Sequence, residues 1–295
     1  MKAYYYTPEQ LNMESFPSGE MRLNKVIAEP TIIPAEADVF VISAGFHVVP
    51  DEVLYNLPHW GQHHARHAIL NVSDSFRRFT THPMMIFRCD TTKAVMEANP
   101  WTIPIAWPVE DLRKYHNGPR VFDSGPDVCF VGWISTKLCR EALHRLRQSR
   151  LTTDFTTYDH FYGYLSKEVQ DKRRQPFIDS MAAAKTSLCV RSIPAGVIRY
   201  RFYEAMSMGR LVIHVNDNAV YPFAEHIDYD KFVIKVPEDQ VHDIGSIVFN
   251  KLKEMGPLSQ WRIGVLARAE WLLWLNADDW NMRFAQECEK RIKEL

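Results

Sequence analysis

Short runs of apolar residues alternate along the chain with longer stretches whose apolar positions recur at helical spacing. Continuous apolar runs of this kind are typical of strands that are buried on both faces of a parallel sheet. Strand-like runs occupy residues 2–6, 38–43, 68–72, 84–88, 103–107, 128–133, 151–157, 187–190 and 211–215. Helical patterns cover residues 51–57, 136–149, 241–253, 260–275 and 279–293. The alternation predicts an α/β protein with parallel sheets.

Two features of this pattern divide the chain. Residues 111–126 are polar and rich in turn formers, which favours a boundary between two domains. The run at 103–107 lies among prolines, which cannot donate to a strand ladder, so we expect it at a sheet edge. We therefore expect one domain over residues 1–118, a second over residues 119–275, and a final helical segment over residues 276–295.

The composition fits a globular protein and excludes several functions. At 295 residues with 46% hydrophobic content, the chain can bury a sizeable core. Its 35 basic and 36 acidic residues leave a formal charge of −1, so no basic field attracts nucleic acid. The short basic run at 172–174 is expected on a solvated helix face. No apolar run is long enough to span a membrane and no signal peptide is evident, which favours a cytoplasmic protein, with prior removal of an anchor left open.

Two residue types indicate buried packing. The five cysteines have no paired spacing, and Cys89, Cys129 and Cys189 lie inside apolar runs, which is typical of buried, reduced thiols rather than disulfides. The C-terminal helical patterns are dense in tryptophan, at positions 261, 271, 274 and 280. Large aromatic side chains at helical spacing are expected to fill the core.

Candidate chemistry gathers in residues 177–236. A short strand runs into a loop with Pro194 and Gly196, and a helical stretch follows. This stretch carries Arg199, Arg201 and Glu204 on its first turns. After it come a glycine, a second buried strand, and Asn216 and Asp217, with Asp217 at the carboxyl end of the strand. Parallel α/β sheets place ligands at that end.

The cations stand where a helix begins, next to unpaired backbone N–H groups and the positive end of the helix dipole. That position is unfavourable for a cation unless an anion binds. Arg201 and Glu204 are three residues apart on one helix face, so one can hold a phosphate while the other accepts ribose hydroxyls. The alternative is that the two side chains only pair with each other on a solvated helix. Asp217 likewise has an alternative role as a cap or turn residue.

The segment closely resembles the signature region of the exostosin-like glycosyltransferases. The matching elements, in order, are Leu188-Cys189, Gly196, Arg201-Phe202-Tyr203-Glu204-Ala205, Gly209, Val212-Ile213, Asn216-Asp217, Pro222-Phe223, Ile227-Asp228-Tyr229 and Phe232. The resemblance implies the GT-B fold, in which two Rossmann-like domains with parallel sheets face each other across a cleft. It also implies transfer of a sugar from a nucleotide-sugar, usually UDP-linked, to a glycan hydroxyl with inversion. In such folds the C-terminal helix commonly crosses back onto the first domain, which is where residues 276–295 would lie.

The resemblance assigns roles to the cations. A sugar transferase must stabilise the leaving nucleoside diphosphate, for which Arg201 is the first choice, with Arg199 and Arg191 as further cations. Backbone N–H groups near Gly196 would share this task, and Glu204 would bind the ribose. Members of the family often lack the Asp-x-Asp metal motif, so the resemblance implies that arginines replace a divalent cation and that no cofactor is needed.

The catalytic base is expected in the first domain. The segment Ala65-Arg66-His67 loosely resembles a family motif with a histidine, and His47 and Asp74 each follow a predicted strand. A histidine with a pKa near neutrality suits this task. The neighbouring histidines at 59, 63 and 64 have no cysteine or carboxylate partners at metal-ligand spacing, which argues against a metal site.

Two other functions compete with this interpretation. The chain is alternatively a non-catalytic subunit that binds a nucleotide-sugar or glycan and supports a partner transferase. A dehydrogenase is disfavoured because no G-x-G-x-x-G follows a strand. The identities of the sugar and acceptor, and the oligomeric state, are left undecided by the sequence.

Overall fold

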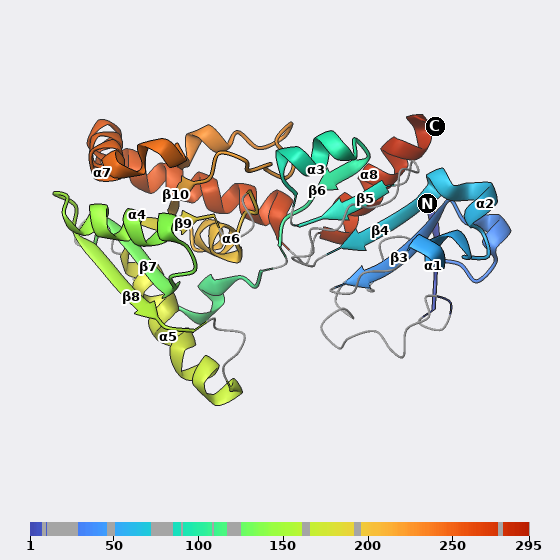
Figure 1. The fold of residues 1–295 in the computed structure, drawn as a ribbon, viewed down its shortest axis with the longest axis horizontal. Coiled ribbons are helices and arrows are strands. Elements are labelled where there is room, and N and C mark those ends of the chain that lie inside the picture. Colours follow the sequence, from blue (N-terminus) through green and yellow to red (C-terminus); the bar gives the residue numbers. More distant parts are fainter. Residues whose placement is uncertain are drawn as a thin grey trace. The chain divides into compact units, whose positions relative to one another are not determined.

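The computed structural model describes residues 1–7, 10, 29–45, 51–71, 85–89, 91–107, 109–116, 125–160, 166–191, 196–276 and 280–294 (Figure 1). The chain forms two compact units. The first contains Met1–Trp107, Val220–Phe223 and Ala277–Leu295, and the second contains Pro108–Ala219 and Ala224–Asn276. The chain thus enters the second unit just before the polar stretch that was expected to separate the halves, and its last helix belongs with the first unit.

The first unit is built on a parallel sheet with the strand order β2-β1-β3-β4-β5-β6. The strands are β1 (Lys2–Tyr5), β2 (Glu29–Pro30), β3 (Val39–Gly45), β4 (His67–Asn71), β5 (Met85–Arg88) and β6 (Thr102–Pro104). Phe40, Ile42, Ile69 and Ile86 from the central strands are buried together, so the apolar runs in the sequence are the core of this sheet. As expected, the proline-containing run lies at a sheet edge, as β6.

The helices of this unit are α1 (Asp51–Tyr55), α2 (Trp60–His63), α3 (Lys93–Ala98) and the longer terminal α8 (Trp280–Glu294). Leu54, Leu57 and Trp60 from the α1–α2 region pack into the same core as Phe40. The helix α3 is capped by Thr92, whose hydroxyl accepts a hydrogen bond from the Val95 N–H.

The second unit holds a five-stranded parallel sheet with the order β11-β10-β9-β7-β8. Its strands are β7 (Val128–Trp133), β8 (Thr153–Tyr158), β9 (Thr186–Val190), β10 (Leu211–Val215) and β11 (Val233–Val236). Every residue of β9 and β10 is buried, which explains why both strands are mostly apolar. Because all five strands run the same way, their carboxyl ends share one edge.

The helices of this unit are α4 (Lys137–Arg147), α5 (Lys167–Ala183), α6 (Tyr200–Ser207) and α7 (Ile244–Glu270), followed by a π-helical turn at Trp271–Leu275. Buried residues of α4 recur at Cys139, Ala142, Leu143 and Leu146, which is the spacing of one helix face. The predicted helices 241–253 and 260–275 are the two arms of α7, bent at Gly256, whose φ is 66°.

The tryptophans near the C-terminus do not all fill the core, in contrast to the expectation from their spacing. Trp271 is fully buried, whereas Trp261 is 42% exposed. Within the described ranges, no helix combines the length and apolarity needed to cross a bilayer.

Candidate functional site

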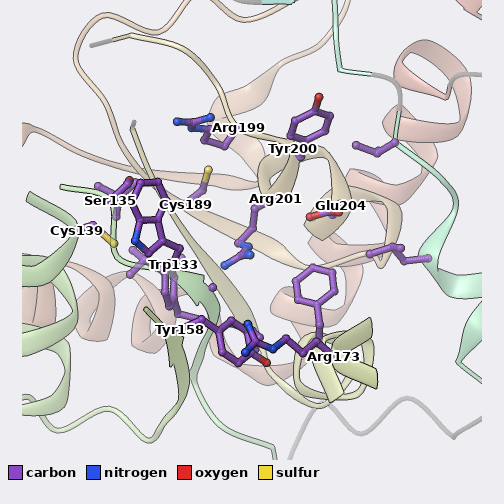
Figure 2. A pocket seen from close by; sticks show the side chains of 18 of the residues that line it. Trp133, Ser135, Cys139, Tyr158, Arg173, Cys189, Arg199, Tyr200, Arg201 and Glu204 are labelled. Atoms are coloured by element: carbon purple, nitrogen blue, oxygen red, sulfur yellow. The ribbon is translucent and has the colours of Figure 1, made fainter. Parts of the chain in front are cut away.

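A cavity of about 530 Å³ lies in the second unit, at the carboxyl ends of β7, β8 and β9 (Figure 2). Residues from these strands, from α5 and from the start of α6 line it. Its position agrees with the general rule that open parallel sheets bind ligands beyond the carboxyl ends of their strands. The described residues of the lining include four arginines and two glutamates, so the cavity has a surplus of positive charge.

Glycines with positive φ lie on both sides of α6. Gly196 has a φ of 112°, in a region that side chains disfavour, and it is buried. Arg199 is the N-cap residue of α6, but its side chain does not cap the helix. At the other end, Gly209 has a φ of 69°, and its N–H donates to the Met206 carbonyl. The first turn of α6 therefore has no side-chain cap from Arg199, and Arg199 lines the cavity instead.

Arg201 reaches from the first turn of α6 into the cavity. Its guanidinium carbon lies 5.0 Å from the ring centre of Phe130 and 5.2 Å from that of Phe177. A Cβ at Gly132 would lie 3.0 Å from both terminal nitrogens, so a glycine at the end of β7 makes room for this cation. The Nε of Arg201 is buried and finds no hydrogen-bond partner in the part of the chain that the structure describes.

Glu204 lies one turn further along α6 and also lines the cavity (Figure 2). Burial raises the pKa of its carboxyl, and the nearby charges of Arg201 and Arg174 oppose that rise. Among the described residues, no ion pair forms between Arg201 and Glu204. The alternative in which these two side chains only neutralise each other on a solvated helix therefore does not describe this structure. Both are turned toward the cavity.

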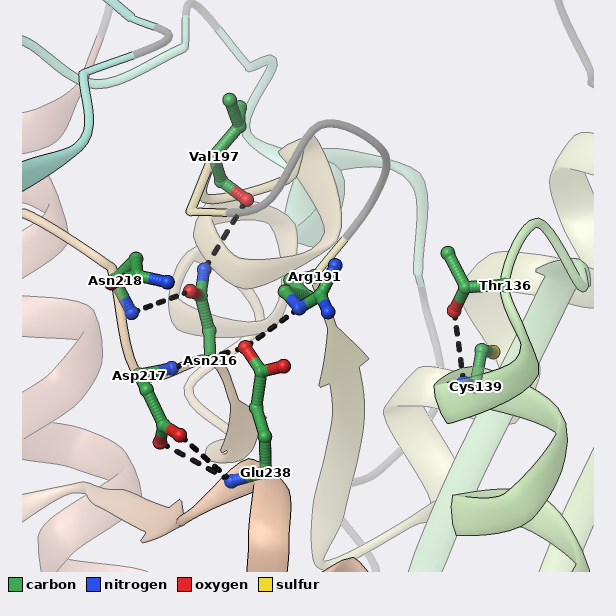
Figure 3. A network of polar contacts seen from close by, with 8 residues as sticks. All are labelled: Thr136, Cys139, Arg191, Val197, Asn216, Asp217, Asn218 and Glu238. Atoms are coloured by element: carbon green, nitrogen blue, oxygen red, sulfur yellow. Dashed lines mark hydrogen bonds and ion pairs between the residues drawn. The ribbon is translucent and has the colours of Figure 1, made fainter. Parts of the chain in front are cut away.

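Arg191 and Asp217 belong to a separate polar network at the ends of β9 and β10 (Figure 3). The Nε of Arg191 lies 2.6 Å from Oε1 of Glu238, which forms an ion pair with it. The Asp217 carboxylate accepts from the Glu238 N–H at 3.2 Å, and the Asp217 N–H donates to Oε1 of Glu238 at 3.3 Å. Neither residue lines the cavity described above. Their expected contact with a nucleotide stays a prediction.

Glu238 was not identified from the sequence. It follows the apolar run that forms β11, so its place at the carboxyl end of a strand was a usable signal. Its partner Arg191 lies 47 residues away in the chain, and only the sheet order brings the two together.

Three aromatic and cationic residues of the cavity were also missed. Trp133 ends β7 and is 42% exposed, and Tyr158 ends β8 directly opposite it in the ladder. The guanidinium carbon of Arg173 lies 3.9 Å from the ring centre of Tyr158. The expectation of a solvated basic run on α5 is therefore wrong for Arg173 and Arg174, which line the cavity, and right only for the exposed Lys172.

Arg174 already has a protein counter-ion. One of its terminal nitrogens forms an ion pair with Glu110, and its guanidinium carbon lies 4.6 Å from the ring centre of Tyr115. It therefore differs from its neighbour Arg173, which has no such pair with any residue in the described ranges.

Of the three candidate bases, the structure describes only His67. His67 has no exposed surface, and both ring nitrogens are engaged: Nδ1 lies 2.8 Å from the His63 carbonyl and Nε2 lies 2.9 Å from the Tyr6 hydroxyl. The carbonyl requires a donor, so Nδ1 carries the proton and Nε2 accepts from Tyr6. Burial lowers the pKa of His67 to about 4. This geometry fits a packing role better than proton transfer. His47 and Asp74 lie outside the described residues.

Side chains that could bind a metal ion are not clustered in the part of the chain that the structure describes. It holds no group of three or more His, Cys, Asp or Glu side chains arranged to bind a metal ion. The one Asp-x-Asp sequence of the chain, Asp228-Tyr229-Asp230, precedes β11 and so lies away from the carboxyl edge. Its carboxylates pair with Lys231 and Lys235.

The cavity also exposes no reactive thiol among its described residues. All five cysteines are buried and free, which confirms the expectation for Cys89, Cys129 and Cys189. Burial raises the pKa of Cys139 to about 11 and that of Cys189 to about 12, so both line the cavity as neutral thiols.

Solved structures with a similar fold include glycosyltransferases. The chain matches a glycosyltransferase from Rickettsia africae ESF-5 with a TM-score of 0.57 at 9% identity, over 100% of this chain and 99% of that one. It matches TarM with a TM-score of 0.50 at 11% identity, over 86% of this chain and 54% of TarM. The chain therefore has two parallel-sheet, Rossmann-like units of the GT-B type. At such identities the likeness shows the fold alone.

No protein-family model and no curated protein matches the chain. The resemblance to the exostosin-like family is thus not shown at the level of the family, and the structural likeness is to GT-B glycosyltransferases more broadly.

Proposed function

We propose that this protein is a glycosyltransferase that moves a sugar from a nucleotide-sugar, UDP-linked by our expectation, to a hydroxyl group of a glycan. One observation carries the proposal. Arg201 and Glu204 project from the first turns of α6 into a cavity at the carboxyl ends of parallel strands, and neither forms an ion pair with a described residue. A partly buried cation without an ion-pair partner is unfavourable, so an anionic ligand is the simplest reason to keep one there.

Each of the two side chains has a task in this proposal. Arg201, with Arg199 beside it and with backbone N–H groups near Gly196, holds the diphosphate and stabilises the charge that grows as the glycosidic bond breaks. The Glu204 carboxylate accepts hydrogen bonds from the ribose hydroxyls. Arginines fill the place of a divalent cation, so we propose that transfer needs no metal.

The acceptor hydroxyl loses its proton to a base in the first unit. His47 and Asp74 are the proposed candidates, and the buried geometry of His67 makes it the weakest of the three. We propose inversion at the anomeric carbon, as the exostosin-like resemblance implies. Product analysis by NMR tests this point, because retention of the donor's anomeric configuration would refute inversion and leave the transferase proposal intact.

A second candidate function follows from His67. Both of its ring nitrogens are hydrogen-bonded and its side chain has no exposed surface, so His67 is not placed to take a proton from an acceptor. That observation favours a binding subunit that holds a nucleotide-sugar or glycan for a partner transferase. We expect either protein to act in the cytoplasm.

A donor panel separates the two functions. The protein is incubated with UDP- and GDP-sugars, with and without EDTA, and nucleotide release is measured for the wild type and for Arg201→Ala. We expect release from at least one donor, insensitive to EDTA and lost in the variant. Binding without release would support the binding subunit, and turnover unchanged in Arg201→Ala would refute the proposed site.

A further inference from the structure

Arg173 on α5 is a cation to which neither the sequence motif nor the proposed function assigns a role. Its guanidinium carbon lies 3.9 Å from the ring centre of Tyr158, which fixes the group against an aromatic face. Its Nη1 is buried and makes no hydrogen bond within the described ranges. A guanidinium cannot lose its charge at physiological pH, so this group is a cation that pairs with no anion among the described residues.

Arg173 and Arg201 each contact aromatic rings that line one cavity. Arg173 and Phe177 are four residues apart on α5 and thus lie on the same helix face. The Phe177 ring in turn lies 5.2 Å from the guanidinium carbon of Arg201. Both arginines line the same cavity, and Figure 2 shows their side chains entering it from α5 and α6.

The remaining arginine of α5 is not equivalent. Arg174 forms an ion pair with Glu110, so its charge is already balanced. The ligand therefore meets two cations, Arg173 and Arg201, each with a buried nitrogen that has no partner in the described part of the chain. They approach from two helices that follow different strands of the sheet.

A nucleoside diphosphate carries negative charge on each of two phosphates, and more when it leaves the sugar. One guanidinium fork binds one phosphate group well, so full neutralisation needs two cations or a metal ion. We propose that Arg173 is the second diphosphate-binding cation of this pocket, with Arg201 as the first. The proposal rests on the proposed function and adds a residue from α5 to the binding machinery.

Tyr158 has a supporting role in this arrangement. By holding the guanidinium against its ring, it restricts the rotamers of a long side chain before the ligand arrives, which lowers the entropic cost of binding. Tyr158 is thus a positioning residue. Replacement by phenylalanine keeps the face, and replacement by leucine removes it.

Calorimetry with nucleotides of decreasing charge tests the proposal. The wild type is first titrated with UDP, GDP, CDP and ADP to find the diphosphate that it binds best. That diphosphate and its free nucleoside are then titrated into Arg173→Met, Arg173→Lys and Lys172→Met. Lys172 is an exposed cation on the same helix, so its variant controls for the change in charge.

We expect Arg173→Met to weaken diphosphate binding by about 10- to 100-fold and to leave nucleoside binding unchanged, because charge-assisted hydrogen bonds are lost. Arg173→Lys should lose less, and Lys172→Met almost nothing. Unchanged diphosphate affinity in Arg173→Met would overturn the proposal while leaving the nucleotide site of Arg201 in place. An equal loss for nucleoside and diphosphate would also overturn it. If the wild type binds no nucleoside diphosphate, the proposed function fails as well.

Chemical rescue provides a readout that a packing role would not move. With the donor that the wild type turns over, we expect added guanidinium chloride at low millimolar concentration to raise turnover by Arg173→Ala several-fold. Thermal melting of Arg173→Ala and Arg173→Lys establishes that each variant is folded. A folded Arg173→Ala with impaired turnover and no rescue, together with an Arg173→Lys equally impaired, would refute the assignment of a cation at this position.

Discussion

Arg268 contacts the C-terminal end of α6, and Arg201 projects from its N-terminal end. The two arginines differ in whether the fold supplies a partner for their charge. Arg268 of α7 binds Asp111 through two hydrogen bonds of 2.9 Å and also donates to the Ser207 carbonyl at the end of α6. Arg201 rests on aromatic rings with its Nε unpaired among the described residues. Arg268 is therefore fixed by polar contacts within the fold, whereas Arg201 has no anionic partner among the described residues.

Removal of Arg268 should have the largest effect on folding. Its side chain is 14% exposed and that of Asp111 is 11% exposed, so Arg268→Met leaves a buried carboxylate without its partner. We expect the free energy of unfolding to fall by about 3–5 kcal/mol, as measured by chemical denaturation. The double variant Arg268→Met with Asp111→Leu should recover part of that loss. A loss below about 1 kcal/mol for the single variant would show that the ion pair does not anchor α6.

Replacement of Arg201 should weaken ligand binding and leave the stability of the fold nearly unchanged. Because no described residue forms an ion pair with it, Arg201→Met should leave the free energy of unfolding within about 0.5 kcal/mol of wild type. Its affinity for a nucleoside diphosphate should fall by about 10- to 100-fold. Denaturation and calorimetry on the same preparation separate the two effects. A strongly destabilised Arg201→Met would place Arg201 in the same class as Arg268.

The first unit offers a further contrast, because its buried His67 is fully paired. The pKa of His67 is about 4 in the folded protein and near 6.5 when unfolded. The stability contributed by the neutral ring is complete above pH 6.5 and decreases as the pH falls toward 4, since only the unfolded state takes up the proton. We expect a loss of about 2 kcal/mol between about pH 7.5 and about pH 5, measured by denaturation at each pH. The His67→Gln variant should not show this pH-dependent loss. An equal loss of unfolding free energy in the wild type and in the variant would contradict the assignment to His67.

A small change next to Arg201 should have the smallest effect. In Gly132→Ala the new methyl group would lie 3.0 Å from both terminal nitrogens of Arg201. The end of a long side chain can shift, but the φ of 159° at Gly132 strains any side chain there, so we expect the unfolding free energy to fall by about 1 kcal/mol. The displaced cation should lower diphosphate affinity by a few-fold to about tenfold. An unaltered affinity would show that the position of the guanidinium beside Gly132 does not matter.

The sequence predicted those features that depend on residues close together in the chain. Apolar runs identified the buried strands β9 and β10, and the three-residue spacing predicted that Arg201 and Glu204 share one face of α6, which is the face that lines the cavity. Contacts that depend on the order of strands were missed. Arg173 reaches the cavity because β8 lies beside β7 and brings Tyr158 under it, a fact that no local pattern contains.

The order of the strands also explains why Arg191 and Asp217 contact Glu238 and do not line the cavity. Both stand at the carboxyl ends of strands, as expected, but Glu238 from the end of β11 engages each of them. A residue next to the right edge of a sheet can therefore serve the fold or the ligand, and the sequence alone does not distinguish the two. The two roles are distinguished by whether another side chain of the fold, such as Glu238, already pairs with the residue.

The most direct test is a calorimetric titration of UDP, and of GDP if UDP does not bind, into wild type, Arg201→Met and Arg262→Met. Arg262 is an exposed arginine on α7 that is not part of the cavity lining, and it serves as the matched control. We expect one binding event in the wild type, unchanged affinity in Arg262→Met, and a loss of about 10- to 100-fold in Arg201→Met. Equal affinity in all three proteins, or no heat from any nucleoside diphosphate with the wild type, would contradict a phosphate-binding role for the unpaired arginine of α6.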